Sequence, residues 1–101
     1  MTSTFNVVVQ YRTKPGTTDD VLKHLHTMAT ETRMEPGNIS YEFFRGVEDD
    51  RKITILESYR SEEDFELHRQ TPHCLNLGPA HIIPQLESRT LSTYVTAASP
   101  A

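Results

Sequence analysis

The 101-residue sequence has one cysteine, no tryptophan and no long hydrophobic run. The single cysteine, Cys74, excludes a disulfide within the chain and a cysteine-based zinc site. No apolar stretch approaches the roughly 20 residues that span a bilayer. The Met-Thr-Ser-Thr start has neither the basic part nor the apolar part of a signal peptide. We therefore expect a cytoplasmic protein with no membrane partner.

The charge balance and the absence of common motifs exclude further classes. Lys and Arg number 10 against 14 Asp and Glu, which gives a formal net charge of −4. Because no basic stripe is present to neutralise phosphates, nucleic acid is not an expected partner. The phosphate loop, the Gly-x-Gly-x-x-Gly turn, Gly-x-Ser-x-Gly and His-Glu-x-x-His are all absent. Any chemistry must come from a less standard set of residues.

The length predicts one domain with one core over residues 1–101. Hydrophobic residues make up 36% of the chain, enough for a thin core. Burial against a second copy of the chain would supply the apolar contact that such a core lacks.

Residues 35–59 carry the clearest pattern in the sequence, which is typical of a β-hairpin. Pro36-Gly37 ends a helix, and the residues that follow alternate between apolar and polar with a period of two. A polar turn over residues 46–51 precedes a second alternating strand. The apolar faces of the two strands are formed by Ile39, Tyr41, Phe43, Ile53 and Ile55.

The flanking segments predict two further strands and two helices. Strands are expected over residues 5–12 and 86–95, and a flexible tail over 96–101. A capping box of Thr17 and Asp20 is expected to open a helix that runs to about residue 34. A second box, Ser61 to Asp64, opens the other helix, with Phe65 and His68 facing inward. Thr71-Pro72 predicts a further helical turn, and residues 78–86 are expected to be irregular.

The resulting order of strand, helix, strand, strand, helix, strand predicts a ferredoxin-like βαββαβ fold of the α+β class. Its antiparallel sheet has helices on one face only. Val8, Phe44 and Leu56 put apolar groups on the other face, and a patch of that kind is rarely left exposed in a monomer. A homodimer that covers this face is therefore expected.

Glu57 is the residue that fits a simple core least well, because it shares the apolar face of its strand with Ile55 and Tyr59. A carboxylate there costs free energy unless it has a partner. Either the face lines a cavity with polar contents, or Glu57 lies at the sheet rim. Desolvation would raise the pKa of Glu57 and suit it to act as a general base. A salt bridge to an arginine across the dimer is the alternative.

Five histidines are the other candidate functional groups. His24 and His26 lie two residues apart on a helix, so their side chains point in different directions. Both are therefore expected to be surface residues. His68 and His73 bracket the Thr71-Pro72 turn, which could bring both to one end of the sheet. A metal site there would need a nearby carboxylate or third histidine. A pocket base or hydrogen-bond donor is the preferred interpretation, and a capping or packing role is the alternative.

Two segments of the sequence resemble the antibiotic biosynthesis monooxygenase (ABM) family. Residues 35–42, Glu-Pro-Gly-Asn-Ile-Ser-Tyr-Glu, resemble that family's E-x-G-c-x-x-Y segment. Residues 57–73, Glu-Ser-Tyr-Arg-Ser-Glu-Glu-Asp-Phe-Glu-Leu-His-Arg-Gln-Thr-Pro-His, are similar to its E-x-W/Y-x-s-x-x-a-x-x-x-H-x-x-T/S-x-H segment. The resemblance extends from the first strand to the last.

This resemblance implies a dimeric α+β barrel with a pocket between sheet and helices in each subunit. Some members of the family oxidise polycyclic quinone precursors or quinols with O2 and no cofactor. Others isomerise a small phosphorylated sugar, degrade haem or have no known activity. In the oxygenases a pocket base deprotonates a phenol, the anion passes an electron to O2, and the radical pair recombines. An apolar pocket that stabilises an anion suits such chemistry.

By position, Tyr59 stands where the family has Trp or Tyr, Glu57 matches its strand carboxylate, and His68 and His73 match its two histidines. The implied function is a monooxygenase that acts on a small hydroxylated aromatic with O2 and needs neither a cofactor nor a metal. The expected catalytic residues are His68, Glu57 and Tyr59, and the expected substrate-binding residues are Tyr41, His73, Asn38 and Phe65.

Two alternatives remain open at this point. One is a dimer that binds small molecules without turnover, and the other is an isomerase or haem-degrading relative of the same fold. Haem degradation ranks low because that branch uses a strand-one Asn deeper in the strand than Asn6, where this chain has valines.

Overall fold

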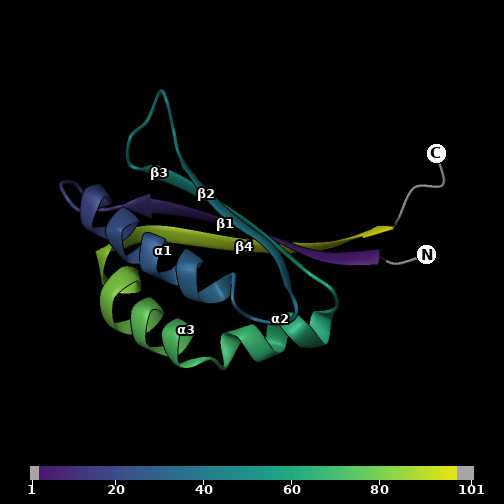
Figure 1. The fold of residues 1–101 in the computed structure, drawn as a ribbon. Helices are drawn as coiled ribbons and strands as arrows, with labels where there is room; N and C mark the ends of the chain where they lie inside the picture. The colour runs from purple at the N-terminus through teal and green to yellow at the C-terminus, as the bar shows by residue number, and fades with distance from the viewer. Residues whose placement is uncertain (1–2, 98–101) are drawn as a thin grey trace.

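The strand over Ser3–Thr13, β1, lies inside a four-stranded antiparallel sheet with the order β2-β3-β1-β4. The hairpin strands are β2 (Asn38–Arg45) and β3 (Lys52–Tyr59), and β4 (Leu86–Ala97) is the edge strand on the other side. The computed structural model describes residues 3–97. Figure 1 shows the long β1 and β4 side by side, with every helix on one face of the sheet. The α+β ferredoxin-like fold predicted from the sequence is confirmed.

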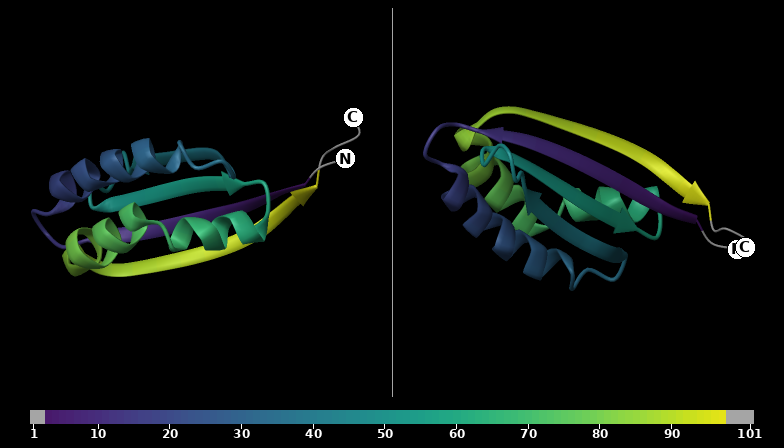
Figure 2. Two further views of the ribbon diagram at one scale, coloured as in Figure 1. Left: turned by 60° about the horizontal axis from the view of Figure 1, so that its bottom comes forward. Right: turned by 90° about the horizontal axis from the view of Figure 1, so that it is seen from above.

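Three helices and two short helical turns form the second layer. They are α1 (Thr18–Thr32), α2 (Glu62–Arg69), α3 (Pro72–Leu77), the π-helical turn η1 (Gly78–Ile82) and the 3₁₀ turn η2 (Ile83–Gln85). In Figure 2, α1 lies toward β2, whereas α2 and α3 lie toward β4. None of the helices within residues 3–97 is long and apolar enough to cross a membrane.

The segment 78–86 was expected to be irregular, and that expectation is wrong for most of it. Residues 78–85 form the helical turns η1 and η2. Pro79 and Pro84 each lie at the start of a turn, where the missing N–H group leaves no hydrogen bond unmade.

The predicted capping box at the start of α1 is absent. Thr17 has a helix-like backbone and no capping bond from its side chain. Its hydroxyl group instead donates to the carbonyl oxygens of Lys14 at 2.8 Å and Gln85 at 3.1 Å. The side chain therefore joins the end of β1 to η2 and is unavailable as a cap. The helix also ends at Thr32, two residues earlier than expected.

The caps predicted for the other two helices are present. Ser61 Oγ accepts a hydrogen bond from the backbone N–H of Asp64 at 3.2 Å and fixes the start of α2. Thr71 Oγ1 accepts from the N–H of Cys74 at 3.3 Å, and Pro72 is the first residue of α3. Two short helices with separate caps thus follow one another, and the break between them lies at residues 70–71.

The core forms where the odd-numbered side chains of β1 and β3 meet the apolar side of α1 and parts of the other helices. This is the face that the period-two alternation predicts. Its buried hydrophobic members include Val7, Val9, Ile53, Ile55, Tyr59, Val21, Leu25, Met28, Phe65 and Ile82.

The opposite face has a polar buried residue that the sequence did not predict. Asn6, on the face of β1 away from the helices, is buried. Its amide donates to Thr96 Oγ1 at 2.8 Å, and its oxygen accepts from the Ser58 hydroxyl at 2.7 Å. Thr96 and Ala97 belong to β4, paired with Thr4 and Ser3. The expectation of a tail over 96–101 is therefore wrong for these two residues, and 98–101 lie outside the described residues.

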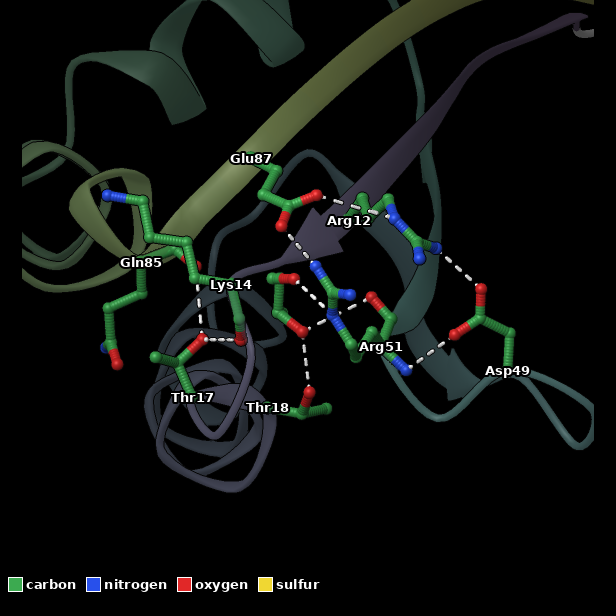
Figure 3. Close-up of polar contacts among 9 residues, drawn as sticks. Arg12, Lys14, Thr17, Thr18, Asp49, Arg51, Gln85 and Glu87 are labelled. Carbon is green, nitrogen blue, oxygen red and sulfur yellow. Dashed lines mark hydrogen bonds and ion pairs between the residues drawn. The ribbon is translucent and has the colours of Figure 1, made fainter.

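A group of charged residues joins β1, the hairpin turn and β4 at the end of the sheet where α1 begins (Figure 3). Arg12 contacts Asp49 at 2.6 Å, and its bond holds the pKa of the Asp49 carboxyl below its usual value. Arg51 donates to the Thr13 carbonyl at 2.9 Å and pairs with Glu87. These contacts are largely exposed, so we expect them to fix the register of the strand ends more than to add stability.

The turn before β2 generates a stability prediction. A Cβ atom on Gly37 would lie 2.5 Å from Cβ of Asp64, whose position is fixed by the Ser61 cap. Gly37→Ala should therefore lower the free energy of unfolding by about 1–3 kcal/mol. In urea titrations Gly78→Ala is the control, because nothing lies within 4 Å of its added Cβ. Equal midpoints for the two variants would contradict the close packing of Gly37 on α2.

Candidate functional site

A cavity of about 390 Å³ lies between the sheet and the α2–α3 side of the helical layer. Its volume falls within the range of small-molecule sites, which is roughly 300–1,000 Å³. Most of the wall is apolar, and the remaining wall residues carry hydroxyl, thiol or ionisable groups. The apolar wall includes Val9, Met28, Ile55, Phe65, Pro79 and Ile83, and the polar wall includes Tyr11, Glu57, His68, Arg69, Cys74 and Arg89.

Glu57 lies in the cavity wall and not at the sheet rim, which decides between the two placements left open by the sequence. It is buried on the helix-covered face of β3. Tyr59, two residues along the same face, donates its hydroxyl hydrogen to Glu57 Oε1 at 2.6 Å. Burial raises the pKa of Glu57, and the Tyr59 bond and the neighbouring His68 oppose that rise in part. Burial also raises the pKa of Tyr59 far above its usual value, so this phenol stays a donor.

His68 lies between two carboxyl groups. Its Nδ1 atom is 2.8 Å from Glu35 Oε2, a hydrogen bond. Its Nε2 atom is 3.7 Å from Glu57 Oε1, which is an electrostatic contact too long for a hydrogen bond. The same Glu35 oxygen is 2.6 Å from Nε2 of His73. The structure thus forms a continuous chain of side chains in the order His73, Glu35, His68, Glu57 and Tyr59.

The break between α2 and α3 brings the two histidines onto one carboxylate. The Thr71 hydroxyl donates to the carbonyl of His68 at 2.7 Å and also caps α3. His68 is therefore in the last turn of α2, and His73 is in the first turn of α3. Glu35 reaches them from the turn after α1, where its N–H bonds to the carbonyl of Thr32 at 3.0 Å.

The shared carboxylate determines the tautomer of His68. An ionised carboxylate only accepts hydrogen bonds. Each ring nitrogen that faces Glu35 must therefore carry a hydrogen, which places one on Nδ1 of His68. In the neutral ring Nε2 then holds the lone pair. This unprotonated nitrogen is on the Glu57 side of the ring, where His68 borders the cavity.

Glu35 supplies the carboxylate that a metal site at His68 and His73 would need. Their three candidate ligand atoms lie within 4.8 Å of one another. The Glu35 oxygen is 2.8 and 2.6 Å from the two ring nitrogens. Ligands at tetrahedral zinc are roughly 3.3 Å apart. The arrangement fits shared hydrogens better than it fits a metal ion.

Of the remaining predicted site residues, some line the cavity and others lie outside its wall. Tyr41 and Phe65 line the cavity. Tyr59 and His73 are not in the wall. Tyr59 is linked to it through Glu57, and His73 is linked to it through Glu35 and then His68. Asn38, expected to bind substrate, is outside the cavity. Its side-chain amide donates to the carbonyl of Ser40 at 3.0 Å, where the register shifts at the start of β2. The side chain therefore supports the backbone of the strand and does not face a ligand.

Three residues of the site were missed by the sequence reasoning. Glu35 was quoted within the family segment but not singled out, and its place in a turn gave no periodic signal. Tyr11 shares a face with Val9 and could have been found by alternation. Burial, followed by the charge of Glu57, raises its pKa to about 12. Arg89 faces Tyr11 only because of the β1–β4 register, which the sequence does not reveal.

Comparison with known proteins fits this geometry. The family model described as antibiotic biosynthesis monooxygenase matches residues 4–77, from β1 through α3. The chain belongs to the antibiotic biosynthesis monooxygenase family. The segment that the family model matches contains all five of the connected side chains, which are His73, Glu35, His68, Glu57 and Tyr59.

Individual relatives of the ABM protein are distant in sequence and close in fold. "Putative monooxygenase YcnE" of Bacillus subtilis (strain 168) is 26% identical over 62 residues, which are 61% of this chain and 65% of the relative, just under two thirds of its length. The solved structure of SO0527 from Shewanella oneidensis has a TM-score of 0.87 at 23% identity and 96% coverage of both chains. Rv0793 from Mycobacterium tuberculosis has a TM-score of 0.81 at 26% identity and 97% coverage of both chains.

The raised pKa of Glu57 generates a prediction about stability and pH. Above the ordinary value of 4.5 the unfolded chain ionises Glu57 more readily than the folded ABM protein does. The residue therefore costs stability as pH rises through its folded pKa. Glu57→Gln removes that cost, so the unfolding free energy of the variant relative to wild type should increase between pH 4 and pH 8. Denaturant titrations at each pH measure the difference, and a difference that is flat or falls would show that Glu57 is not desolvated.

Proposed function

We propose that this ABM protein is a cofactor-independent monooxygenase that oxidises a small hydroxylated aromatic or quinol-type substrate with O2. Membership of the family supports the reaction class. The cavity supports the substrate class, because its walls are mostly apolar and it is of small-molecule size.

The observation that carries the proposal is the contact of the Glu35 carboxylate with Nδ1 of His68, from which an unprotonated Nε2 at the cavity follows. Glu35 holds the opposite ring nitrogen at 2.8 Å, so a proton taken up at Nε2 creates an imidazolium that already has a carboxylate partner. A base with its lone pair exposed to an apolar cavity suits the deprotonation of a phenol. Tyr59 donates its hydroxyl hydrogen to Glu57 at 2.6 Å, so this carboxyl group is already hydrogen-bonded beside the base.

The proposed steps balance for a substrate with an activated methylene group, such as an anthrone in its phenolic form. His68 Nε2 takes the phenolic proton, and the resulting anion gives one electron to O2. The two radicals combine to form a C–O bond, and the peroxide then loses water to leave a carbonyl group. One CH2 group and one O2 thus become one C=O group and one water molecule. His68 returns its proton within the cycle.

Other predicted residues receive supporting roles in this proposal. Tyr59 holds Glu57 in place through its hydrogen bond. Tyr41 and Phe65 form aromatic parts of the cavity wall, with their ring centroids 6.5 and 6.1 Å from that of His68. His73 completes the pair of donors to Glu35.

The proposal is tested by O2 uptake with a panel of quinols and anthrones. His68→Gln should lower kcat by about 10²–10⁴-fold, the usual contribution of a general base. The control is His26→Gln, an exposed histidine of α1 that is away from the cavity.

The outcomes separate the function from its residue assignment. No substrate-dependent O2 uptake by the wild type across the panel would contradict the function. Ligand-induced thermal stabilisation without product would then favour the non-catalytic binding dimer. Full activity in His68→Gln, with an active wild type, would remove His68 as the base and leave the function standing.

We further propose that the protein is a cytoplasmic homodimer. The sheet face without helices, on the upper side in Figure 1, carries the pair Val8 and Leu56 and the nearby Phe44. Leu56 and Phe44 are 41% and 48% exposed in the single chain, so this face presents adjacent apolar side chains that a second copy of the chain would cover. A stable interface on this face would bury upwards of about 2,000 Å².

Sedimentation equilibrium at micromolar concentration tests the dimer. The wild type should have twice the 11.5 kDa mass of one chain. Leu56→Asp should shift it toward monomer or aggregate, because the charge would be desolvated in the interface. Leu67→Asp is the matched control, since Leu67 is 63% exposed on α2 and away from this face. A wild-type mass near that of one chain would contradict the proposal.

A further inference from the structure

Of the ionisable groups in the cavity wall, the carboxyl and imidazole groups are buried and the guanidinium groups are exposed. Glu57 and His68 are only 6% and 5% exposed and form its buried end. Arg89 and Arg69 also line the cavity, and both are exposed. The apolar wall therefore connects a buried acid–base pair to exposed wall residues that carry guanidinium groups.

Arg89 is oriented toward the cavity by its place in the sheet. It pairs with Tyr11 across the β1–β4 register, so it lies on the helix-covered face of the edge strand. β4 runs alongside α2 and α3 in Figure 2. The charge of Arg89 opposes the rise in the pKa of Tyr11, which indicates that the guanidinium group lies near this wall hydroxyl.

Neither arginine is strongly neutralised by the protein. Among residues 3–97, Arg89 forms no ion pair, whereas Arg12, Arg45 and Arg51 each contact a carboxylate within 3 Å. Arg69 has one exposed contact with Glu66 at 3.6 Å. Its guanidinium carbon also lies 5.8 Å from the centre of the Phe65 ring, which is part of the cavity wall. The outer cavity thus offers positive charge that an uncharged quinol would leave without a partner.

We propose that the substrate of this site is an aromatic acid, with its hydroxyl group at His68 and a carboxylate at the opposite end bound by Arg89. The inference rests on the proposed function for the choice of the reacting end. A guanidinium group matches a carboxylate with two parallel hydrogen bonds, so Arg89 would fix the orientation of the ring as well as its affinity. An acid at this end also keeps the negative charge away from the carboxyl groups at the buried end.

Two probes that differ by one carboxylate test the proposal by titration calorimetry. 6-Hydroxy-2-naphthoate has its hydroxyl and carboxylate at opposite ends of the ring system, and 2-naphthol lacks the carboxylate. Wild type should bind the acid about 10-fold or more tightly than 2-naphthol, the usual effect of a hydrogen bond to a charged group. Added salt should weaken the binding of the acid and leave that of 2-naphthol unchanged.

The decisive comparison is between two arginine variants with the same change in charge. Arg89→Gln should lower the affinity for the acid to near that for 2-naphthol and leave 2-naphthol binding unchanged, which also shows that the variant is folded. Arg60→Gln is the control, because Arg60 follows β3 outside the cavity wall and, within residues 3–97, has no ion pair either. It should bind both probes as the wild type does.

Three results would overturn the aromatic-acid inference: equal affinity of the wild type for both probes, no binding of either probe, or equal losses in Arg89→Gln and Arg60→Gln. The proposed function is judged separately. Oxygen uptake with an uncharged quinol in the wild type would preserve the monooxygenase even where the acid preference fails.

Discussion

The carboxyl group of Glu57 on the apolar face of the sheet is the constraint on which the site depends. Burial of an uncompensated charge there would cost more free energy than a small domain has to spare. Tyr59 donates to it at 2.6 Å, and His68 faces it at 3.7 Å. His68 in turn needs Glu35, and Glu35 is shared with His73. The break between α2 and α3 brings His68 and His73 onto Glu35, so the same break in the helix also orients the histidine that lines the cavity.

The same contacts determine which ring nitrogen of His68 carries the hydrogen. Because Glu35 only accepts hydrogen bonds, it fixes a hydrogen on Nδ1 and leaves Nε2 open on the Glu57 side, at the cavity. Catalysis by a histidine requires the correct tautomer as much as the correct position. At the buried end of the cavity the low polarity of the wall strengthens the interactions between charged groups such as Glu57 and His68. A fold found with many functions thus acquires a specific one through a few buried polar groups.

Sequence patterns predicted the parts that follow from local periodicity. The alternation on β3 placed Glu57 on the inner face, and the Ser61 cap placed His68 inward on α2. Glu35 and Arg89 were missed because their positions depend on a turn and on the pairing of strands about 80 residues apart, with a register shift at Arg12 and Thr13. Thr17 failed as a cap because its hydroxyl is used by the end of β1 and by η2, a tertiary contact that competes with the local signal.

The most direct test of the account is the tautomer of His68, read from the nitrogen and carbon-bound hydrogen resonances of its ring by long-range ¹H–¹⁵N NMR at neutral pH. The structure predicts a hydrogen on Nδ1 and an unprotonated Nε2. The Glu35→Gln variant should lose this fixed pattern. A hydrogen on Nε2 in the wild type, or the exchange-averaged pattern of a surface histidine such as His26, would contradict the central claim that Glu35 directs the lone pair of His68 to the cavity.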